Sequence, residues 1–173
     1  EIARLNVLAF DKTGTITENR LQVKEVDRCA DQPELLRAIV CANDADGLAG
    51  DPLDLALLSY ARAQGANVEE LRASLPRKSE RAFDAGHRYQ RVTVQAGGES
   101  GGELVSYLKG APEALLDRSC LSPAERSAWS ASAMERAGEG LRVLAVAGTR
   151  GESDSDLTPL GLVNFWDPPR AEA

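Results

Sequence analysis

A carboxylate followed by small hydroxyl residues and a glycine is the segment of this sequence best suited to chemistry. It occupies residues 11–17 (Asp-Lys-Thr-Gly-Thr-Ile-Thr), directly after an apolar run at 5–10. The run predicts a buried strand, which would place Asp11 at the sheet edge where open α/β folds bind their ligands. An aspartate held ionised beside a divalent cation can attack a phosphoryl group and carry it covalently. Gly14 would let backbone amides approach the phosphate oxygens.

An ordinary polar turn would account for an aspartate and a nearby glycine, but it does not require seven adjacent positions to match a pattern. The string at 11–17 resembles the phosphorylation motif of P-type ATPases, the ion and lipid pumps that pass through an aspartyl-phosphate. The resemblance implies that Asp11 is the phosphorylated residue, with Lys12 and Thr13 in the same catalytic segment. It also implies Mg²⁺, bound in the parent pump by the Asp11 carboxylate and the Thr13 backbone carbonyl.

A second motif lies at residues 50–57 (Gly-Asp-Pro-Leu-Asp-Leu-Ala-Leu). A proline in the first turn and acidic residues near the positive end of the dipole are typical of a helix start. The same string resembles a segment of these pumps in which a glutamate contacts the adenine end of ATP. Asp54 keeps a carboxylate at that position on a shorter stem, and the resemblance therefore places it in the nucleotide site.

A third motif, residues 109–113 (Lys-Gly-Ala-Pro-Glu), predicts the junction between a strand and a helix that begins with proline. In P-type ATPases the same string lines the nucleotide pocket. The resemblance implies that Lys109 sits against adenine, while Gly110 and Ala111 let the ligand approach the backbone.

A fourth motif, residues 167–170 (Asp-Pro-Pro-Arg), must end the apolar segment before it, because two prolines cannot continue a paired strand. In the family this string marks the return of the chain to the phosphorylation domain. The resemblance implies that Asp167 and Arg170 lie near the hinge and the phosphates.

Three further residues enter the predicted site through the same resemblance. Phe83 lies upstream of the Lys-Gly-Ala turn, where relatives stack a phenylalanine on adenine, although a lone phenylalanine at a strand end is usually core. Arg88 lies where many relatives carry a basic residue near the phosphates. Arg142 interrupts an apolar strand and corresponds to an arginine that reaches the β-phosphate region.

The composition agrees with a single domain that is large enough to build a core. The chain has 173 residues and a formal net charge of −7, which argues against a nucleic-acid partner or an anionic membrane surface. The sequence shows neither a signal peptide nor an apolar stretch of membrane-spanning length.

Strands and helices alternate in groups along the chain, and this order predicts an α+β fold with a mixed or antiparallel sheet flanked by helices. It matches the nucleotide-binding domain that P-type ATPases insert into a haloacid-dehalogenase-like phosphorylation domain. By that reading residues 1–17 belong to the phosphorylation domain, 18–166 form the nucleotide-binding domain and 167–173 return through the hinge. The expected strands are 20–26, 79–83, 89–95, 104–109, 141–147 and 160–165, and the expected helices are 33–43, 52–64, 68–73, 112–118 and 123–137.

The sequence thus predicts a piece of a P-type cation-transporting ATPase, outside the heavy-metal class, that binds ATP without turning it over. Its partners would be ATP and the phosphorylation, actuator and membrane domains of the parent, and its location the cytoplasmic side of a cell-membrane protein. Two other classes stay open: a haloacid-dehalogenase-type phosphatase or phosphotransferase, and a non-catalytic regulatory module. The transported ion cannot be read from these residues, because selectivity resides in the membrane segments.

Overall fold

The computed structural model describes residues 20–47, 49–97 and 102–168. Within them the helices and strands follow the order expected from the sequence. These elements are β1 (Gln22–Asp27), α1 (Gln32–Cys41), α2 (Pro52–Ala63), α3 (Val68–Ser74), β2 (Arg77–Arg81), β3 (Tyr89–Ala96), β4 (Glu103–Gly110), α4 (Pro112–Leu116), α5 (Pro123–Gly138), β5 (Arg142–Arg150) and β6 (Thr158–Trp166).

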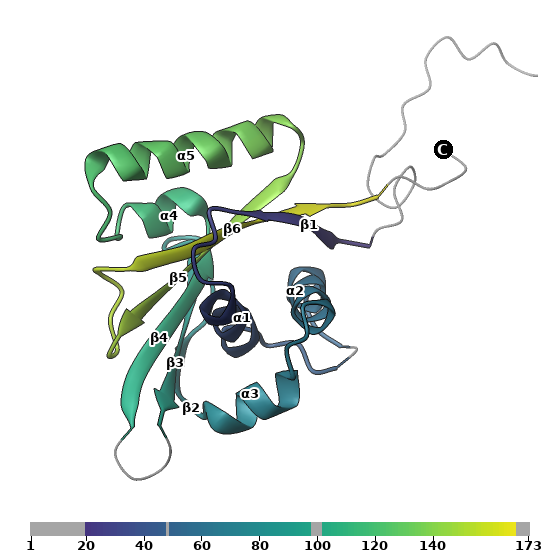
Figure 1. Cartoon of the computed structure of the whole chain (residues 1–173), viewed down its shortest axis with the longest axis vertical. Coiled ribbons are helices and arrows are strands. Elements are labelled where there is room, and N and C mark those ends of the chain that lie inside the picture. The colour runs from purple at the N-terminus through teal and green to yellow at the C-terminus, as the bar shows by residue number, and fades with distance from the viewer. Residues whose placement is uncertain (1–19, 48, 98–101, 169–173) are drawn as a thin grey trace, which may run out of the picture.

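The strands form one sheet in the order β1-β6-β5-β4-β3-β2, and every neighbouring pair is antiparallel. This confirms the α+β class and narrows the expected mixed or antiparallel sheet to a fully antiparallel one. The first strand pairs with the last, with Gln22 opposite Trp166, so the described chain enters and leaves the sheet on adjacent strands (Figure 1).

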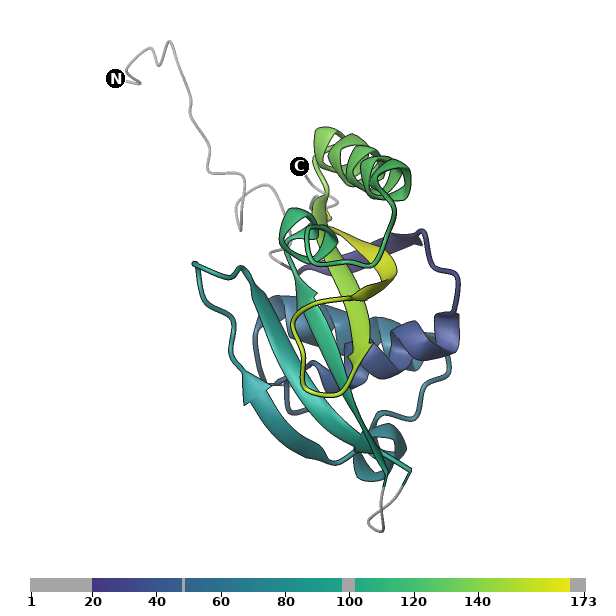
Figure 2. The ribbon, with the colours of Figure 1, turned by 90° about the vertical axis from the view of Figure 1, so that its left-hand side faces the viewer.

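Helices cover both faces of the sheet (Figures 1 and 2). Helices α1, α2 and α3 pack on one face around a core that includes Leu35, Leu57 and Phe165. The shorter α4 and the long α5 cover the other face, over a smaller core that includes Leu108 and Leu162. Successive side chains of a central strand point to opposite cores, as Tyr107 and Leu108 do in β4.

The helix starts follow from local sequence chemistry. Asp31, Asp51, Asn67 and Ser122 each accept a hydrogen bond from a backbone N–H of the first turn of the helix that follows. Helix α5 has a complete capping box, in which Glu125 also accepts from the Ser122 backbone. Among the described helices none combines the length and hydropathy needed to cross a bilayer.

Several boundaries differ from expectation by one to three residues, and the shift of β2 moves a predicted site residue. β2 ends at Arg81 rather than at 83, so Phe83 lies in the connection to β3 instead of at a strand end. Continuing the register would pair Phe83 with Tyr89, where β3 is only beginning. β5 continues to Arg150, three residues further than expected, because its pairing with β4 extends to Val105.

Candidate functional site

The predicted site residues that the structure describes gather at one end of the sheet. Antiparallel pairing brings the start of β3 to the end of β4, with Tyr89 opposite Gly110. It also brings the start of β5 to the end of β6, with Arg142 opposite Phe165. Arg88, Lys109 and Arg142 therefore lie at the same end of the sheet, although they are far apart in sequence.

Lys109 and Asp54 form a buried ion pair. The Lys109 ammonium contacts Asp54 Oδ1, and the two residues are only 8% and 6% exposed. The second oxygen, Asp54 Oδ2, accepts the Asp44 backbone N–H at 3.0 Å. The pair joins β4 to the first turn of α2, with every atom of the carboxylate engaged. The charge of Lys109 is therefore already neutralised within the fold.

Burial lowers the pKa of Lys109, and the negative charge of Asp54 opposes that effect without cancelling it. Removing either partner would leave an uncompensated charge in this buried position, which costs far more than the intact pair contributes. The pair is consequently part of the folded core as well as of the candidate site.

Asp44 extends the polar cluster toward the surface. Its carboxylate accepts hydrogen bonds from Arg77 Nη1 at 2.7 Å and from Gln90 Nε2 at 2.5 Å. Burial would raise the pKa of Asp44, but the hydrogen bond and charge of Arg77, together with the Gln90 hydrogen bond, outweigh it and hold the pKa below its ordinary value. Gln90 lies directly opposite Lys109 in the sheet, so this cluster braces the ion pair from the neighbouring strand.

A close backbone contact unites the loop before β3 with the turn after β4. A Cβ atom at Gly110 would lie 2.4 Å from the Arg88 carbonyl oxygen, so only glycine fits there. The same carbonyl accepts the Ala111 N–H at 2.9 Å. Arg88 has a left-handed backbone (φ 62°), and its own N–H donates to the Asp84 carbonyl at 2.8 Å. The loop that ends at Arg88 and the turn at Gly110 and Ala111, both predicted to belong to the site, are thus in direct contact.

The remaining described site residues face solvent. Phe83 is 62% exposed. Its apolar ring is unfavourably hydrated, and a ligand stacked on it would remove that surface from water. Arg88 Nη2 pairs with Glu113 Oε1 at 2.8 Å, and both side chains are about half exposed. Arg142 is exposed and forms no ion pair with any described residue. Asp167 Oδ1 accepts the Arg20 backbone N–H at 3.1 Å, where the two ends of the described chain meet.

Four predicted residues, Asp11, Lys12, Thr13 and Arg170, lie outside the described residues. The predicted Mg²⁺ ligands are among them. Within the described ranges, His, Cys, Asp and Glu side chains form no group of three or more that could hold a metal ion.

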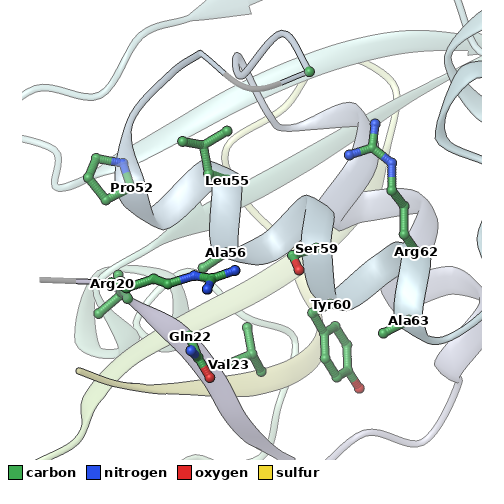
Figure 3. A pocket seen from close by; sticks show the side chains of 12 residues that line it. Arg20, Gln22, Val23, Pro52, Leu55, Ala56, Ser59, Tyr60, Arg62 and Ala63 are labelled. Atoms are coloured by element: carbon green, nitrogen blue, oxygen red, sulfur yellow. The ribbon is translucent and has the colours of Figure 1, made fainter. Parts of the chain in front are cut away.

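A groove of about 720 Å³ lies apart from these residues, between β1 and α2. Val23 and Leu55 contribute apolar surface to it, Ser59 and Tyr60 hydroxyl groups, and Arg20 and Arg62 cations (Figure 3). None of the predicted nucleotide residues lines it, even though α2 carries Asp54 on its other side. The residues expected to form a nucleotide site and this groove are therefore in different places.

Three functional candidates were missed by the sequence analysis: Asp44, Gln90 and Asp154. Asp44 and Gln90 brace the ion pair, and Asp154 anchors the loop that carries Phe83. Each contacts partners tens of residues away, such as Arg91 for Asp154. Long-range pairs of this kind leave no signal in local spacing.

Comparison with known proteins adds independent information. The family described as P-type ATPase, cytoplasmic domain N, matches residues 32–172. A calcium-transporting ATPase from Lactococcus lactis subsp. lactis is 30% identical over an alignment covering 95% of this chain and 22% of that protein. A probable cation-transporting P-type ATPase from Mycoplasma pneumoniae is 29% identical over 98% of this chain and 20% of its own length.

A calcium-transporting ATPase from Schizosaccharomyces pombe is 28% identical, with coverage of 99% of this chain and 23% of that protein. The chain thus spans between a fifth and a quarter of the length of these relatives.

Proposed function

This chain belongs to the family of P-type ATPase cytoplasmic N domains, and from that premise we propose that it binds ATP in a cation-transporting pump and presents the γ-phosphate to Asp11. The transported ion is left open, because the relatives include proteins named for calcium and proteins named only for cations. The parent would hydrolyse ATP, whereas the chain alone would bind nucleotide without turnover.

The observation that carries this proposal is the close contact around Gly110. It holds the backbone of Arg88, at the end of the loop that carries Phe83, against the turn formed by Lys109, Gly110 and Ala111. An adenine ring stacked on Phe83 would gain about 1–3 kcal/mol, by analogy with bases stacked on aromatic side chains.

Within this site Asp54 acts through its partner. Its two oxygens are engaged by the Lys109 ammonium and the Asp44 N–H, so it fixes the direction of the lysine against which adenine would rest. Gly110 and Ala111 supply the closely approaching backbone beside it. Selectivity for adenine would come from the fixed polar groups of Lys109 and of the backbone at Gly110 and Ala111. Most of the affinity would come from stacking on Phe83.

The phosphate side of the site would consist of arginines. Arg142 is exposed and can turn toward the ligand without breaking an ion pair with another described residue. Arg88 would exchange its half-exposed contact with Glu113 for a phosphate oxygen, a stronger charge-assisted hydrogen bond. Asp167 and Arg170 would lie at the hinge end of the phosphates.

The meeting of the chain ends supports the proposed domain boundaries. Residues 18–166 would form the nucleotide-binding unit, 1–17 a strand of the phosphorylation domain, and 167–173 the return to that domain. The contact between Arg20 and Asp167 brings the two connections together, as a two-stranded hinge requires. The other domains of the pump would then lie at this edge, with the unit on the cytoplasmic side of the membrane.

Phosphoryl transfer itself would take place on residues outside the described ranges. Asp11 would be the phosphorylated carboxylate, with Lys12 and Thr13 beside it. Mg²⁺, when bound through Asp11 and the Thr13 carbonyl, would neutralise charge on the phosphates. The contribution of the described residues is to bind and orient the nucleotide, which accounts for much of the catalysis in transfers of this kind.

The test is a titration of ATP, ADP and AMP into the chain, followed by calorimetry and by heteronuclear NMR. We expect saturable binding between micromolar and millimolar, about −8 to −4 kcal/mol. Amide shifts should centre on Phe83, Arg88 and Lys109, and no ATP should be hydrolysed. Phe83→Ala should weaken ATP binding by about 1–3 kcal/mol and reduce the shifts accordingly, and Lys109→Glu should abolish them. Met134→Ala removes another exposed apolar side chain, from α5, and should change nothing.

Two outcomes would contradict the proposal. Absence of any saturable shift at millimolar ATP would remove nucleotide binding altogether and favour a regulatory module. Shifts centred on Val23 and Tyr60 would instead place the ligand in the groove between β1 and α2.

A further inference from the structure

We infer that Asp154 is a positioning residue for the nucleotide loop, defined as residues 82–88, an inference that rests on the proposed function. Asp154 lies in the connection between β5 and β6 and touches none of the residues expected to contact ATP. It acts by holding the two ends of the loop that carries Phe83 and Arg88.

A single carboxylate joins both ends of the nucleotide loop. The loop leaves β2 after Arg81 and enters β3 at Tyr89. Asp154 Oδ2 accepts hydrogen bonds from Arg81 Nη1 at 2.5 Å and from the Tyr89 hydroxyl at 2.8 Å. The other oxygen, Oδ1, accepts from Arg91 Nη1 at 2.6 Å. Fixing both ends at one point removes much of the freedom that a seven-residue connection would otherwise keep.

The Tyr89 ring carries this constraint into the loop. The ring is buried, and the guanidinium of Arg118 lies 5.3 Å from its centroid on one side. His87 of the nucleotide loop meets the ring edge-on, with centroids 5.8 Å apart. Asp84 in turn accepts the Gly86 and His87 backbone N–H groups at 2.8 and 2.9 Å. A chain of contacts thus runs from Asp154 to the residues on both sides of Arg88.

The electrostatic setting makes Asp154 hard to replace. It is the carboxylate that Arg81 and Arg91 share, while Glu152 adds a second contact to Arg91 at 3.1 Å. Burial would raise the pKa of Asp154, but hydrogen bonds from Tyr89 and Arg91 and the charges of both arginines leave it below the ordinary value. Loss of its charge would leave two guanidinium groups facing each other at the ends of the loop, which would then open.

The opposite edge of the sheet offers a matched control. Asp27 in β1 accepts from Arg136 Nε at 2.7 Å and from Asn164 Nδ2 at 2.9 Å. Its side chain is 20% exposed and that of Asp154 25%. The two clusters have similar chemistry and burial, but β1 and β2 are the two edge strands of the sheet. Only the Asp154 cluster touches the nucleotide loop.

The experiment compares Asp154→Asn with Asp27→Asn in the whole chain. We expect both to lower the melting temperature by similar amounts, since each loses a charged partner of an arginine. Asp154→Asn alone should weaken ATP binding, by about tenfold, the equivalent of one charge-assisted hydrogen bond. In the absence of ATP it should also shift the Gly86 and His87 amide resonances, which Asp27→Asn should leave in place.

A second variant keeps the inference open to test should Asp154→Asn fail to fold. Tyr89→Phe removes the hydroxyl that donates to Asp154 and accepts from Arg81 Nη1 at 3.4 Å, and it should give a smaller loss of affinity with the same resonance shifts. Unchanged affinity in both variants, or equal losses in Asp27→Asn, would overturn the positioning role while leaving nucleotide binding intact. Failure of the wild-type chain to bind ATP would overturn the proposed function and this inference with it.

Discussion

The buried half of the candidate site and its exposed half differ in when they contribute free energy. Lys109 and Asp54 are sequestered between β4 and α2, and their interaction is complete before any ligand arrives. Phe83 and Arg142 are exposed to solvent, and in the proposed function they would gain partners only when nucleotide binds. The first half is therefore part of folding as well as of recognition, whereas the second can be altered without cost to the fold.

The largest effect should come from breaking the buried pair. Lys109→Met leaves the Asp54 carboxylate unpaired in the core and should lower the free energy of unfolding by about 3–5 kcal/mol. The double variant Lys109→Met with Asp54→Leu should recover most of that loss, since apolar residues of similar volume often replace a buried pair. Urea denaturation of both variants measures this. A single variant as stable as wild type would show that the pair is not sequestered.

Phe83→Ala should reduce the affinity for ATP but not the stability of the fold, in contrast to Lys109→Met. It should weaken ATP binding by about 1–3 kcal/mol through loss of the stacking surface. It should leave the melting temperature within error, because an exposed side chain contributes little to stability. Calorimetry beside a thermal melt separates the two effects. A large drop in stability would mean that Phe83 packs against the fold.

Arg142→Ala should give a smaller loss, about 0.5–1 kcal/mol, because an exposed ion contact is screened by solvent. The loss should appear with ATP and ADP more than with AMP, since the arginine is expected near the β-phosphate. Arg150→Ala is the matched control, because it removes an arginine from the other end of β5. Equal losses for all three nucleotides would place Arg142 away from the phosphates.

The smallest effect concerns Asp44, which braces the buried pair from the surface, and the dependence of stability on acid pH. The pKa of Asp44 is lower in the folded chain than the ordinary value of about 3.9 expected on unfolding. Its stabilising contribution is thus complete above about pH 4 and is lost as the pH falls through the folded-state pKa. Asp44→Asn should flatten the dependence of unfolding free energy on pH in that acid range. An unchanged slope would show that other carboxylates account for it.

Local chemistry made most of the fold predictable. The proline and capping residue before α2 and α5 specified helix starts, and alternating apolar residues specified the strands. The order of strands was not predictable, because the pairing of β1 with β6 joins opposite ends of the chain. The end of β2 was also misplaced, since it depends on where β3 begins.

In the candidate site, too, local motifs identified individual residues but not the contacts between them. Motif strings identified Lys109 and Asp54 separately, but no local pattern indicated that they form a buried pair across 55 positions. Asp154 was not singled out from the sequence, because its partners lie 63 to 73 positions away. Such residues come together only when the whole sheet has formed.

The adjacency of the first and last strands has a mechanical consequence. Both connections leave from the same edge, with Gln22 opposite Trp166, so a pull on the two ends would peel β1 from β6. The hydrogen bonds would then break one after another rather than together, at low force. The Arg136 contact to Asp27, at the far end of β1, would be the last to yield. If the proposed hinge lies at this end of the sheet, it would let the domain rotate but would withstand little tension.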